Sequence, residues 1–296
     1  MKTLKELRIR AHAKVNLYLD VVGKRQDGYH NLETVFHSIG LHDQVILHEQ
    51  SEKGFTVLCE HKDVPTDCNN LAYGAAQILN DVVGGIGGLE IRINKRIPVA
   101  AGLAGGSANA AAVLYGVNEL FALGLSTKQL MDIGVKLGAD VPFCLHGGAA
   151  YGTGIGDILT PLPSLCDIPL VLINSGIAVS TANVFKNFNI TLTKQKKESI
   201  IIRTCVEKSD IIGVGKNLYN ILEGAVFAKH PELTELKDQL STQTGCYGAL
   251  MSGSGATMFA LMEDTDAAKQ AQVLFENNIG FCTTTKTTSV GVCFDN

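Results

Sequence analysis

Residues 97–111 read IPVAAGLAGGSANAA, a run of small residues that leads directly into an alanine-rich segment. Residues 89–95 before this run alternate apolar and polar side chains, which predicts a strand, and residues 107–122 after it are expected to form a helix. A loop in this position offers free backbone N–H groups at the positive end of the helix dipole, and glycine lets the backbone approach an anion closely. The stretch therefore predicts either a phosphate-binding loop or a glycine-rich turn that packs against a neighbouring helix.

The loop matches neither of the two common nucleotide-binding motifs. The sequence G-x-x-x-x-G-K-[ST] of a Walker A loop occurs nowhere in the chain, and the loop is not the G-x-G-x-x-G of a Rossmann fold. Both of these nucleotide-binding classes are therefore excluded.

The composition is that of a globular protein that binds small molecules. A chain of 296 residues approaches the size at which a single core stops growing, so two lobes are expected. Hydrophobic residues make up 46% of the chain, which is ample for a core. The net charge of −4 argues against a nucleic-acid partner, because such proteins usually carry a basic face. We expect the lobes to meet near Pro161 and Pro163, with domains at residues 1–162 and 163–296.

Cysteine and histidine spacing points away from disulfides and zinc. The eight cysteines include no C-x-x-C pair, and the eight histidines include no H-x-x-x-H pair. Such thiols suit a reducing compartment. Residues 1–10 lack the apolar core of a signal peptide, and no run approaches the roughly 20 apolar residues of a membrane span. We therefore expect a cytoplasmic protein without a membrane partner.

Residues 9–21 alternate apolar and polar side chains, which predicts a strand with one buried face. Lys14 and Asn16 lie on the other face, about 6.6 Å apart along the strand. If no other functional residue lies nearby, the simpler interpretation is an edge strand with a solvated polar face.

The rest of the chain alternates strands and helices irregularly, which favours an α+β protein. Further strands are expected at residues 34–40, 44–48, 55–59, 148–151, 169–174, 246–251 and 257–262, with a closing strand at the end of the chain. Further helices are expected at residues 70–83, 126–137, 181–188, 216–230, 231–240 and 266–277, and residues 191–197 form a solvated loop.

Three segments together resemble the GHMP kinase superfamily. They are AKVNL at residues 13–17, the stretch at residues 98–111, and MSGSGA at residues 251–256. The resemblance spans nearly the whole chain. It implies the two-lobe GHMP kinase fold, with the active site in the cleft between the lobes and with ATP and Mg²⁺ as cofactors.

Two further segments resemble one branch of that superfamily, the kinases of 4-diphosphocytidyl-2-C-methyl-D-erythritol, or CDP-methylerythritol. They are GKRQDGYHNL at residues 23–32 and GADVPF at residues 138–143. The resemblance implies transfer of a phosphoryl group from ATP to the 2-hydroxyl of CDP-methylerythritol in the non-mevalonate route to isoprenoids. The alternatives are another GHMP kinase, of the mevalonate or homoserine type, and a non-catalytic nucleotide-binding protein of the same fold.

The resemblance also assigns a catalytic pair. Asp140 matches the aspartate that accepts the proton of the attacking hydroxyl, and Lys14 matches the lysine that orients this hydroxyl. Taken without the resemblance, Asp140 would be a turn or capping residue ahead of Pro142, and Lys14 a solvated lysine of an edge strand.

The remaining candidate residues follow from the same resemblance. Substrate-binding candidates are Asn16, Tyr29, His30, Ser180, Thr181 and Phe185. Nucleotide-binding candidates are Asn70, Lys95, Pro98, Val99, Ala100, Ala101, Gly102, Leu103, Ala104, Gly105, Gly106, Ser107, Ala108, Gly253, Ser254 and Gly255. No carboxylate cage for the metal can be identified in the sequence.

The loop departs from its relatives at four alanines. Ala100, Ala101 and Ala104 stand where many members of the superfamily have glycine, and Ala108 stands where serine is common. A methyl group is tolerated at such positions if the residue keeps a negative φ. The methyl groups also narrow what the loop can do.

Overall fold

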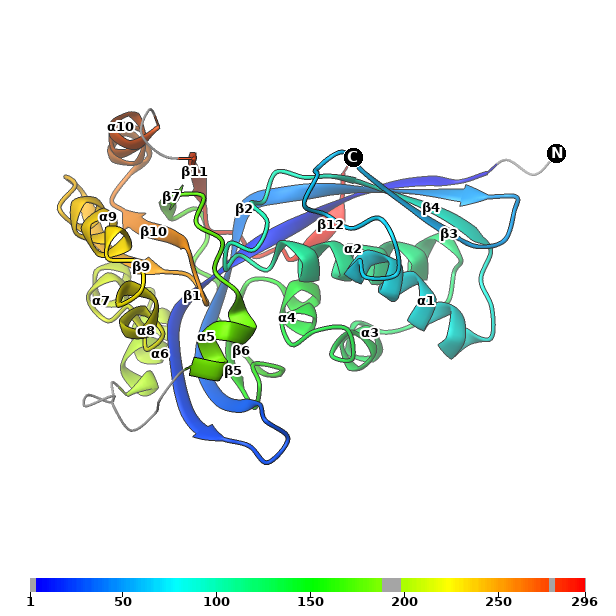
Figure 1. Ribbon diagram of the computed structural model, residues 1–296, viewed down its shortest axis with the longest axis horizontal. Coiled ribbons are helices and arrows are strands. Elements are labelled where there is room, and N and C mark those ends of the chain that lie inside the picture. The colour runs from blue at the N-terminus through cyan, green and yellow to red at the C-terminus, as the bar shows by residue number, and fades with distance from the viewer. Residues whose placement is uncertain (1–3, 188–197, 277–279, 296) are drawn as a thin grey trace.

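The protein contains two β-sheets, each with its own helices. The computed structural model describes residues 4–187, 198–276 and 280–295. Figure 1 shows the two lobes along the long axis of the molecule, with two long strands extending across both. The mixed helices and sheets confirm the predicted α+β class, and the two-lobe arrangement is the one expected.

The first sheet is built on the antiparallel pair β1 (Glu6–Lys24) and β2 (His30–Gln50). Its strand order is β12-β1-β2-β4-β3, with β5 paired to β2, β6 to β5 and β8 to β1. The other strands are β3 (Phe55–Cys59), β4 (Gly88–Asn94), β5 (Ala149–Thr153), β6 (Ile158–Leu162), β8 (Tyr219–Asn220) and β12 (Val292–Phe294).

Helices α1 (Leu71–Val83), α2 (Gly105–Leu120) and α4 (Val141–His146) contact this sheet, and α3 (Thr127–Gly134) packs against these helices. The alanine-rich α2 is buried on most of its surface and packs against β1 and β2. At Gly116 an added Cβ would lie 2.6 Å from Leu47 Cδ1, so small residues are required for this close approach. The approach brings the start of α2, and the loop before it, to the middle of the molecule.

The second sheet has the order β11-β7-β10-β9. Its strands are β7 (Pro169–Asn174), β9 (Cys246–Met251), β10 (Thr257–Met262) and β11 (Phe281–Lys286). The helices of this lobe are α5 (Thr181–Asn187), α6 (Ser199–Glu207), α7 (Ile211–Lys216), α8 (Glu223–Phe227), α9 (Glu232–Ser241) and α10 (Thr265–Phe275). Every residue of the central strands β7 and β10 is buried, as expected for strands covered on both faces.

Several expected elements differ from the observed ones. Strand β1 is buried on both faces rather than one, and β2 is one continuous strand rather than two. The helix expected at residues 216–230 is interrupted by β8, which pairs with β1 at Tyr18 and Leu19. Helices α4, α6 and α7 and strand β6 were not expected, and the loop expected at residues 191–197 lies outside the described residues.

The domain boundary after residue 162 stays a prediction. Strands β8 and β12 lie beyond that boundary in the chain, yet both pair with β1 in the first sheet. Besides the chain connection near residue 162, strands β8 and β12 link the two lobes, because both come from the later part of the chain and pair in the first sheet.

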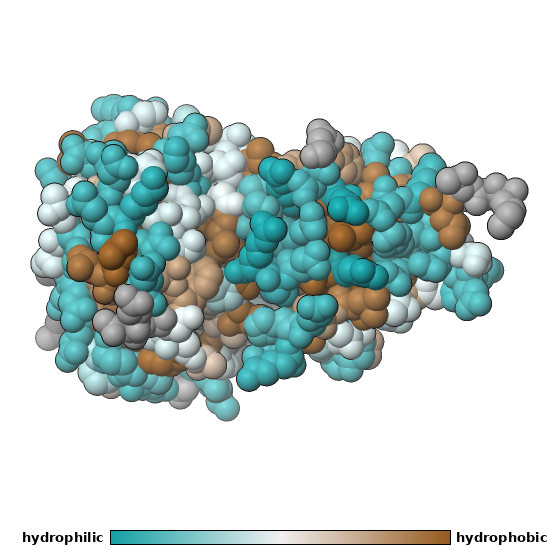
Figure 2. Space-filling view, turned by 90° about the horizontal axis from the view of Figure 1, so that it is seen from above, coloured by the Kyte–Doolittle hydropathy of each residue, from teal (hydrophilic) through white to brown (hydrophobic). Residues whose placement is uncertain are grey.

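The surface is that of a globular protein. Figure 2 shows one face on which hydrophilic residues dominate and apolar residues form small separate patches. Within the described ranges, no helix combines the length and the apolar character that crossing a bilayer requires.

Candidate active site

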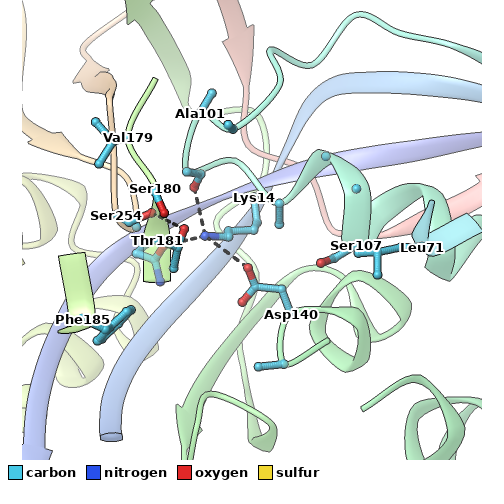
Figure 3. Close-up of a pocket in the computed structure, with 18 of the residues that line it drawn as sticks. Lys14, Leu71, Ala101, Ser107, Asp140, Val179, Ser180, Thr181, Phe185 and Ser254 are labelled. Carbon is cyan, nitrogen blue, oxygen red and sulfur yellow. Dashed lines mark hydrogen bonds and ion pairs between the residues drawn. The ribbon is translucent and has the colours of Figure 1, made fainter. Parts of the chain in front are cut away.

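A cavity of about 1140 Å³ lies between the lobes. Its lining comes from β1 and β2, the loop that precedes α2, the residues before α4, residues 179–186 and the turn at residues 253–254. Figure 3 shows the part of this lining around Lys14. Segments that are far apart in the sequence therefore share one space of a size that accommodates small-molecule ligands.

Lys14 is the centre of the polar contacts in the cavity. Its side chain projects from β1, and the residue is only 4% exposed. The ammonium donates to Asn16 Oδ1 at 2.8 Å and to Gly102 O at 3.0 Å, and it lies 3.7 Å from Asp140 Oδ2 (Figure 3). Since β1 lies inside the sheet, Lys14 is not the solvated edge lysine of the simpler interpretation.

Asp140 occupies the N-cap position of α4, but its side chain makes no capping hydrogen bond. The carboxylate is instead directed toward Lys14, with its side chain 33% exposed (Figure 3). Pro142 in the first turn of α4 fits the start of a helix, since proline has no N–H to donate. The carboxylate is therefore paired with a cation and still accessible from the cavity.

The loop before α2 presents most of its residues to the cavity. The lining includes residues 98–102 and 104–107, whereas Leu103 and Ala108 are buried in the core beneath it. The helix begins at Gly105, so Ser107 lies within its first turn rather than at the predicted helix start. No side chain caps this end of α2, which leaves backbone N–H groups available to an anion.

The condition of negative φ is not met at two alanines of this loop. Ala100 has a φ of 53° and Ala104 a φ of 59°, both in the left-handed region that disfavours a Cβ. Ala104 is the residue that turns the chain into α2. Two non-glycine residues are thus held in an unfavourable backbone conformation beside the cavity.

The loop is held from the other lobe by the turn after β9. Ser252 Oγ donates to Gly102 O at 2.9 Å, and Gly255 N donates to Ser252 O at 3.0 Å. Gly253 and Ser254 line the cavity, whereas Gly255 lies behind them and does not. The predicted third motif therefore braces the loop before α2.

The opposite end of the cavity carries aromatic side chains from both lobes. His30 and Phe185 stack with ring centroids 5.6 Å apart and an interplanar angle of 30°. Tyr29 lines the same end and is 62% exposed. Burial, together with the nearby charge of Lys24, lowers the pKa of His30.

Two hydroxyl residues close the cavity on the side of α5. Ser180 Oγ accepts from Asn183 N at 3.3 Å, as expected for a residue that caps this helix. Thr181 Oγ1 and Ser254 Oγ are 2.7 Å apart, which ties the start of α5 to the turn after β9 (Figure 3).

Comparison with known proteins agrees with this geometry. The model described as "GHMP kinases N terminal domain" matches residues 70–148, and "GHMP kinases C terminal" matches residues 202–276. A 4-diphosphocytidyl-2-C-methyl-D-erythritol kinase of Alkaliphilus metalliredigens is 41% identical over 268 residues, which cover 90% of this chain and 92% of the relative. The chain belongs to the 4-diphosphocytidyl-2-C-methyl-D-erythritol kinase family.

Solved structures include one of the same kinase family and others that share only the fold. A crystal structure of 4-(cytidine 5'-diphospho)-2C-methyl-D-erythritol kinase is 33% identical with a TM-score of 0.79, and the match covers 96% of this chain and 99% of the other. A homoserine kinase from Cytophaga hutchinsonii has a TM-score of 0.78 over 100% and 99% of the two chains, but only 20% identity. The second likeness shows the shared fold alone.

The nucleotide-binding candidates Asn70 and Lys95 both line the cavity. Asn70 is the N-cap of α1, and its side chain accepts from Ala72 N at 2.9 Å. The Lys95 ammonium pairs with the carboxylate of Asp43 and donates to Asn109 Oδ1 at 3.3 Å.

Asp43 was missed from the sequence. It is completely buried in β2 and accepts from Asn109 Nδ2 at 2.9 Å and from the backbone N–H groups of Arg96 and Ile97 at 2.7 and 2.9 Å. The Asp43 carboxylate thus holds both the Lys95 side chain and the backbone of residues 96–97, where the chain enters the loop before α2. Asp43 falls between the strands expected at residues 34–40 and 44–48, where an aspartate is an ordinary turn residue.

Asn220 was also missed, because it lay within an expected helix. Its side chain is buried and donates to Met251 O at 2.8 Å and to Gly253 O at 2.7 Å. These bonds hold the turn that braces Gly102.

Proposed function

We propose that this chain transfers the γ-phosphoryl group of ATP to the 2-hydroxyl of 4-diphosphocytidyl-2-C-methyl-D-erythritol. The observation that carries the proposal is the pair formed by Lys14 and Asp140, 3.7 Å apart in the cavity that the uncapped start of α2 also lines. A carboxylate, an ammonium and backbone N–H donors are the groups that transfer of a phosphoryl group to an alcohol requires.

In this mechanism the triphosphate of ATP lies against the N–H groups at the start of α2. Asp140 accepts the hydroxyl proton while the hydroxyl oxygen forms a bond to the γ-phosphorus. The bond between this phosphorus and the bridging oxygen breaks, and ADP leaves. Lys14 orients the hydroxyl and stabilises the charge that develops as phosphorus is attacked.

We also propose Mg²⁺ as the cofactor that enters with ATP. Among the described residues, no group of three metal-binding side chains forms a cage. The cavity does offer the hydroxyl of Ser107 and the carboxylate of Asp140. This donor set fits Mg²⁺, because Mg²⁺ commonly keeps several waters and binds one or two protein oxygens in addition to phosphate. When bound, the ion would neutralise phosphate charge.

The aromatic end of the cavity is the proposed cytidine site. A base stacked on a ring lies about 3.5 Å from it, so two rings must be about 7 Å apart to enclose one. The 5.6 Å separation of His30 and Phe185 is shorter, so the base stacks on an outer face of this pair. The ring nitrogens of His30 and the exposed Tyr29 add hydrogen-bonding groups and a further ring.

The direct test is turnover of the purified protein with ATP, Mg²⁺ and one alcohol at a time. We expect release of ADP with CDP-methylerythritol and none with mevalonate or homoserine. ATP binding without turnover of any alcohol would contradict the proposal and favour a non-catalytic protein.

A second test distinguishes binding of CDP-methylerythritol at the aromatic end of the cavity from binding of ATP at the loop before α2. CDP-methylerythritol should raise the midpoint of thermal unfolding, because a ligand that binds only the folded state stabilises it. Tyr29→Ala should reduce this shift while leaving the shift produced by ATP in place. Equal loss of both shifts would indicate a folding defect instead.

We further propose that the enzyme acts in the cytoplasm. All eight cysteines are free, which suits a reducing compartment, and both proposed substrates are charged nucleotides that do not cross membranes unaided.

A further inference from the structure

The side chain of Asn16 lies between Lys14 and Thr34, and each of its ends has a partner. Its Oδ1 accepts from Lys14 Nζ at 2.8 Å, and its Nδ2 donates to Thr34 Oγ1 at 2.8 Å. A side-chain amide can flip by exchanging these two ends. A flipped Asn16 would place N–H donors against the Lys14 ammonium, which has only donors.

Thr34 determines which way the amide faces. Its hydroxyl lies 2.7 Å from the carbonyl oxygen of Tyr18, and a carbonyl can only accept. The single hydroxyl proton is therefore donated to Tyr18 O. The hydroxyl oxygen can then only accept from Asn16, so the end of Asn16 that faces Thr34 must be the NH₂ group.

The Tyr18 carbonyl that accepts the proton of the Thr34 hydroxyl lies at an irregularity in the first sheet. The pairing of β1 with β2 changes register between Asn16 and Tyr18, as in a β-bulge. At this point Tyr18 O accepts from the Thr34 side chain.

The Thr34 side chain is itself confined. The residue is completely buried, and a Cβ added to Gly152 on the paired strand β5 would lie 3.0 Å from Thr34 Cγ2. The hydroxyl is therefore held in place by packing as well as by its two hydrogen bonds.

We infer that Thr34 is a positioning residue for phosphoryl transfer: it fixes the amide of Asn16, which in turn directs the Lys14 ammonium toward Asp140 and Gly102. This inference rests on the proposed function. Lys14 has three protons and three neighbouring acceptors, Asn16 Oδ1, Gly102 O and Asp140 Oδ2. If Asn16 Oδ1 no longer accepts from Lys14, the ammonium is free to leave the position in which it faces both Gly102 O and Asp140 Oδ2.

The test compares Thr34→Val, which keeps the shape and removes the hydroxyl, with Thr34→Ser, which keeps the hydroxyl. For Thr34→Val we expect kcat with CDP-methylerythritol to fall about 10- to 100-fold, the effect of misplacing a reacting group, while KM for ATP changes little. Thr34→Ser should retain most of the wild-type kcat.

A matched control is Thr287→Val. Thr287 is also buried, and its hydroxyl accepts from Ile168 N at 2.9 Å, but it does not line the cavity. This variant should lose stability and keep kcat. An equal loss of kcat in Thr287→Val and Thr34→Val would show that Thr34 acts through stability alone and would overturn the inference.

A double-mutant cycle tests the route through Asn16. If Thr34 acts by orienting Asn16, Thr34→Val should lower kcat little further in an Asn16→Ala background. A full, independent loss in that background would also overturn the inference. If Thr34→Val does not fold, Thr34→Ala takes its place in the same cycle. This variant removes the same hydroxyl and adds no carbon in its place.

These outcomes are distinguishable from failure of the proposed function. Absence of turnover by the wild-type protein would refute the proposed function. Turnover by the wild-type protein with an unchanged kcat in folded Thr34→Val would refute the role of Thr34 and leave the proposed function standing.

Discussion

Ser252 and Gly102 meet across the two lobes: the hydroxyl of Ser252 donates to the carbonyl oxygen of Gly102 at 2.9 Å. Gly102 O also accepts from Lys14 Nζ at 3.0 Å. The same carbonyl therefore connects the loop before α2, the turn after β9 and the proposed catalytic lysine. The position of this loop depends on contacts with the other lobe as well as on its own sequence.

Replacement of Gly102 by alanine should displace the loop. Gly102 has a φ of +75°, and an added Cβ would lie 2.1 Å from Ser252 O. We expect Gly102→Ala to lower the free energy of unfolding by about 1–3 kcal/mol, since backbone strain is of this size, and to weaken ATP binding. Thermal unfolding and calorimetric titration with ATP measure the two effects. The control is Gly224→Ala, where the added Cβ meets nothing within 4 Å.

Removal of the Asp43 charge should destabilise the first lobe. The carboxylate is completely buried, and Asp43→Asn would leave the buried Lys95 ammonium without its counter-ion. We expect a loss of about 3–5 kcal/mol in the free energy of unfolding, measured by chemical denaturation. Asp132→Asn breaks the exposed pair with Lys128 and should change stability little. Similar stability of both variants would contradict the importance of the buried pair.

Ala104 offers a substitution that should stabilise the protein. Its φ of 59° costs an L-residue about 1–2 kcal/mol, part of which glycine recovers despite the greater entropy of its unfolded chain. We expect Ala104→Gly to raise the free energy of unfolding by up to about 1 kcal/mol. Ala108→Gly is the opposite control, because Ala108 is a buried residue within α2 and its replacement should destabilise the helix. A loss of stability in Ala104→Gly would contradict the left-handed conformation.

Stability should fall on mild acidification because of His37. Its Nε2 accepts from Leu165 N at 2.9 Å, so Nδ1 carries the proton and donates to Ser38 O at 2.8 Å. Burial lowers the pKa of His37 from 6.5 to about 4. Because the folded pKa is depressed, the neutral ring stabilises the fold above pH 6.5, and this contribution is lost as the pH falls from 6.5 toward 4.

From these pKa values, we expect His37 to lower the free energy of unfolding by about 2 kcal/mol as the pH falls from 7 to 5. Chemical denaturation at both pH values measures the loss. His37→Gln keeps a donor and an acceptor but cannot be protonated, so its stability should depend less on pH. An equal dependence in both proteins would contradict this assignment. His12, whose pKa burial also lowers to about 4, adds to the residual dependence.

Local sequence was sufficient to predict many elements. The bounds of β3, β7, β9 and β10 agree with the expected ranges, because each strand shows its own apolar pattern between turn residues. The helix start at Ser126 agrees with the expected range for the same reason, since both hydrogen bonds of its capping box with Gln129 are local.

Features that depend on tertiary contacts could not be predicted. The range expected to form a helix at residues 216–230 contains β8 instead, which pairs with β1 near the other end of the chain. The positive φ of Ala100 and Ala104 is imposed by a loop braced from the other lobe, against the preference of alanine itself. Asp43 and Thr34 are polar residues within strands, and only the folded structure shows that their partners are buried.

The pair formed by Lys14 and Asp140 is the central claim, and the kcat of purified Asp140→Asn with ATP and CDP-methylerythritol tests it most directly. The side chain of Asp140 is 33% exposed and makes no capping bond to α4, and Lys14 keeps its hydrogen bonds to Asn16 and Gly102, so the variant should still fold. We expect kcat to fall about 10²- to 10⁴-fold, the usual contribution of a general base. A folded Asp140→Asn protein with near wild-type kcat would contradict the account.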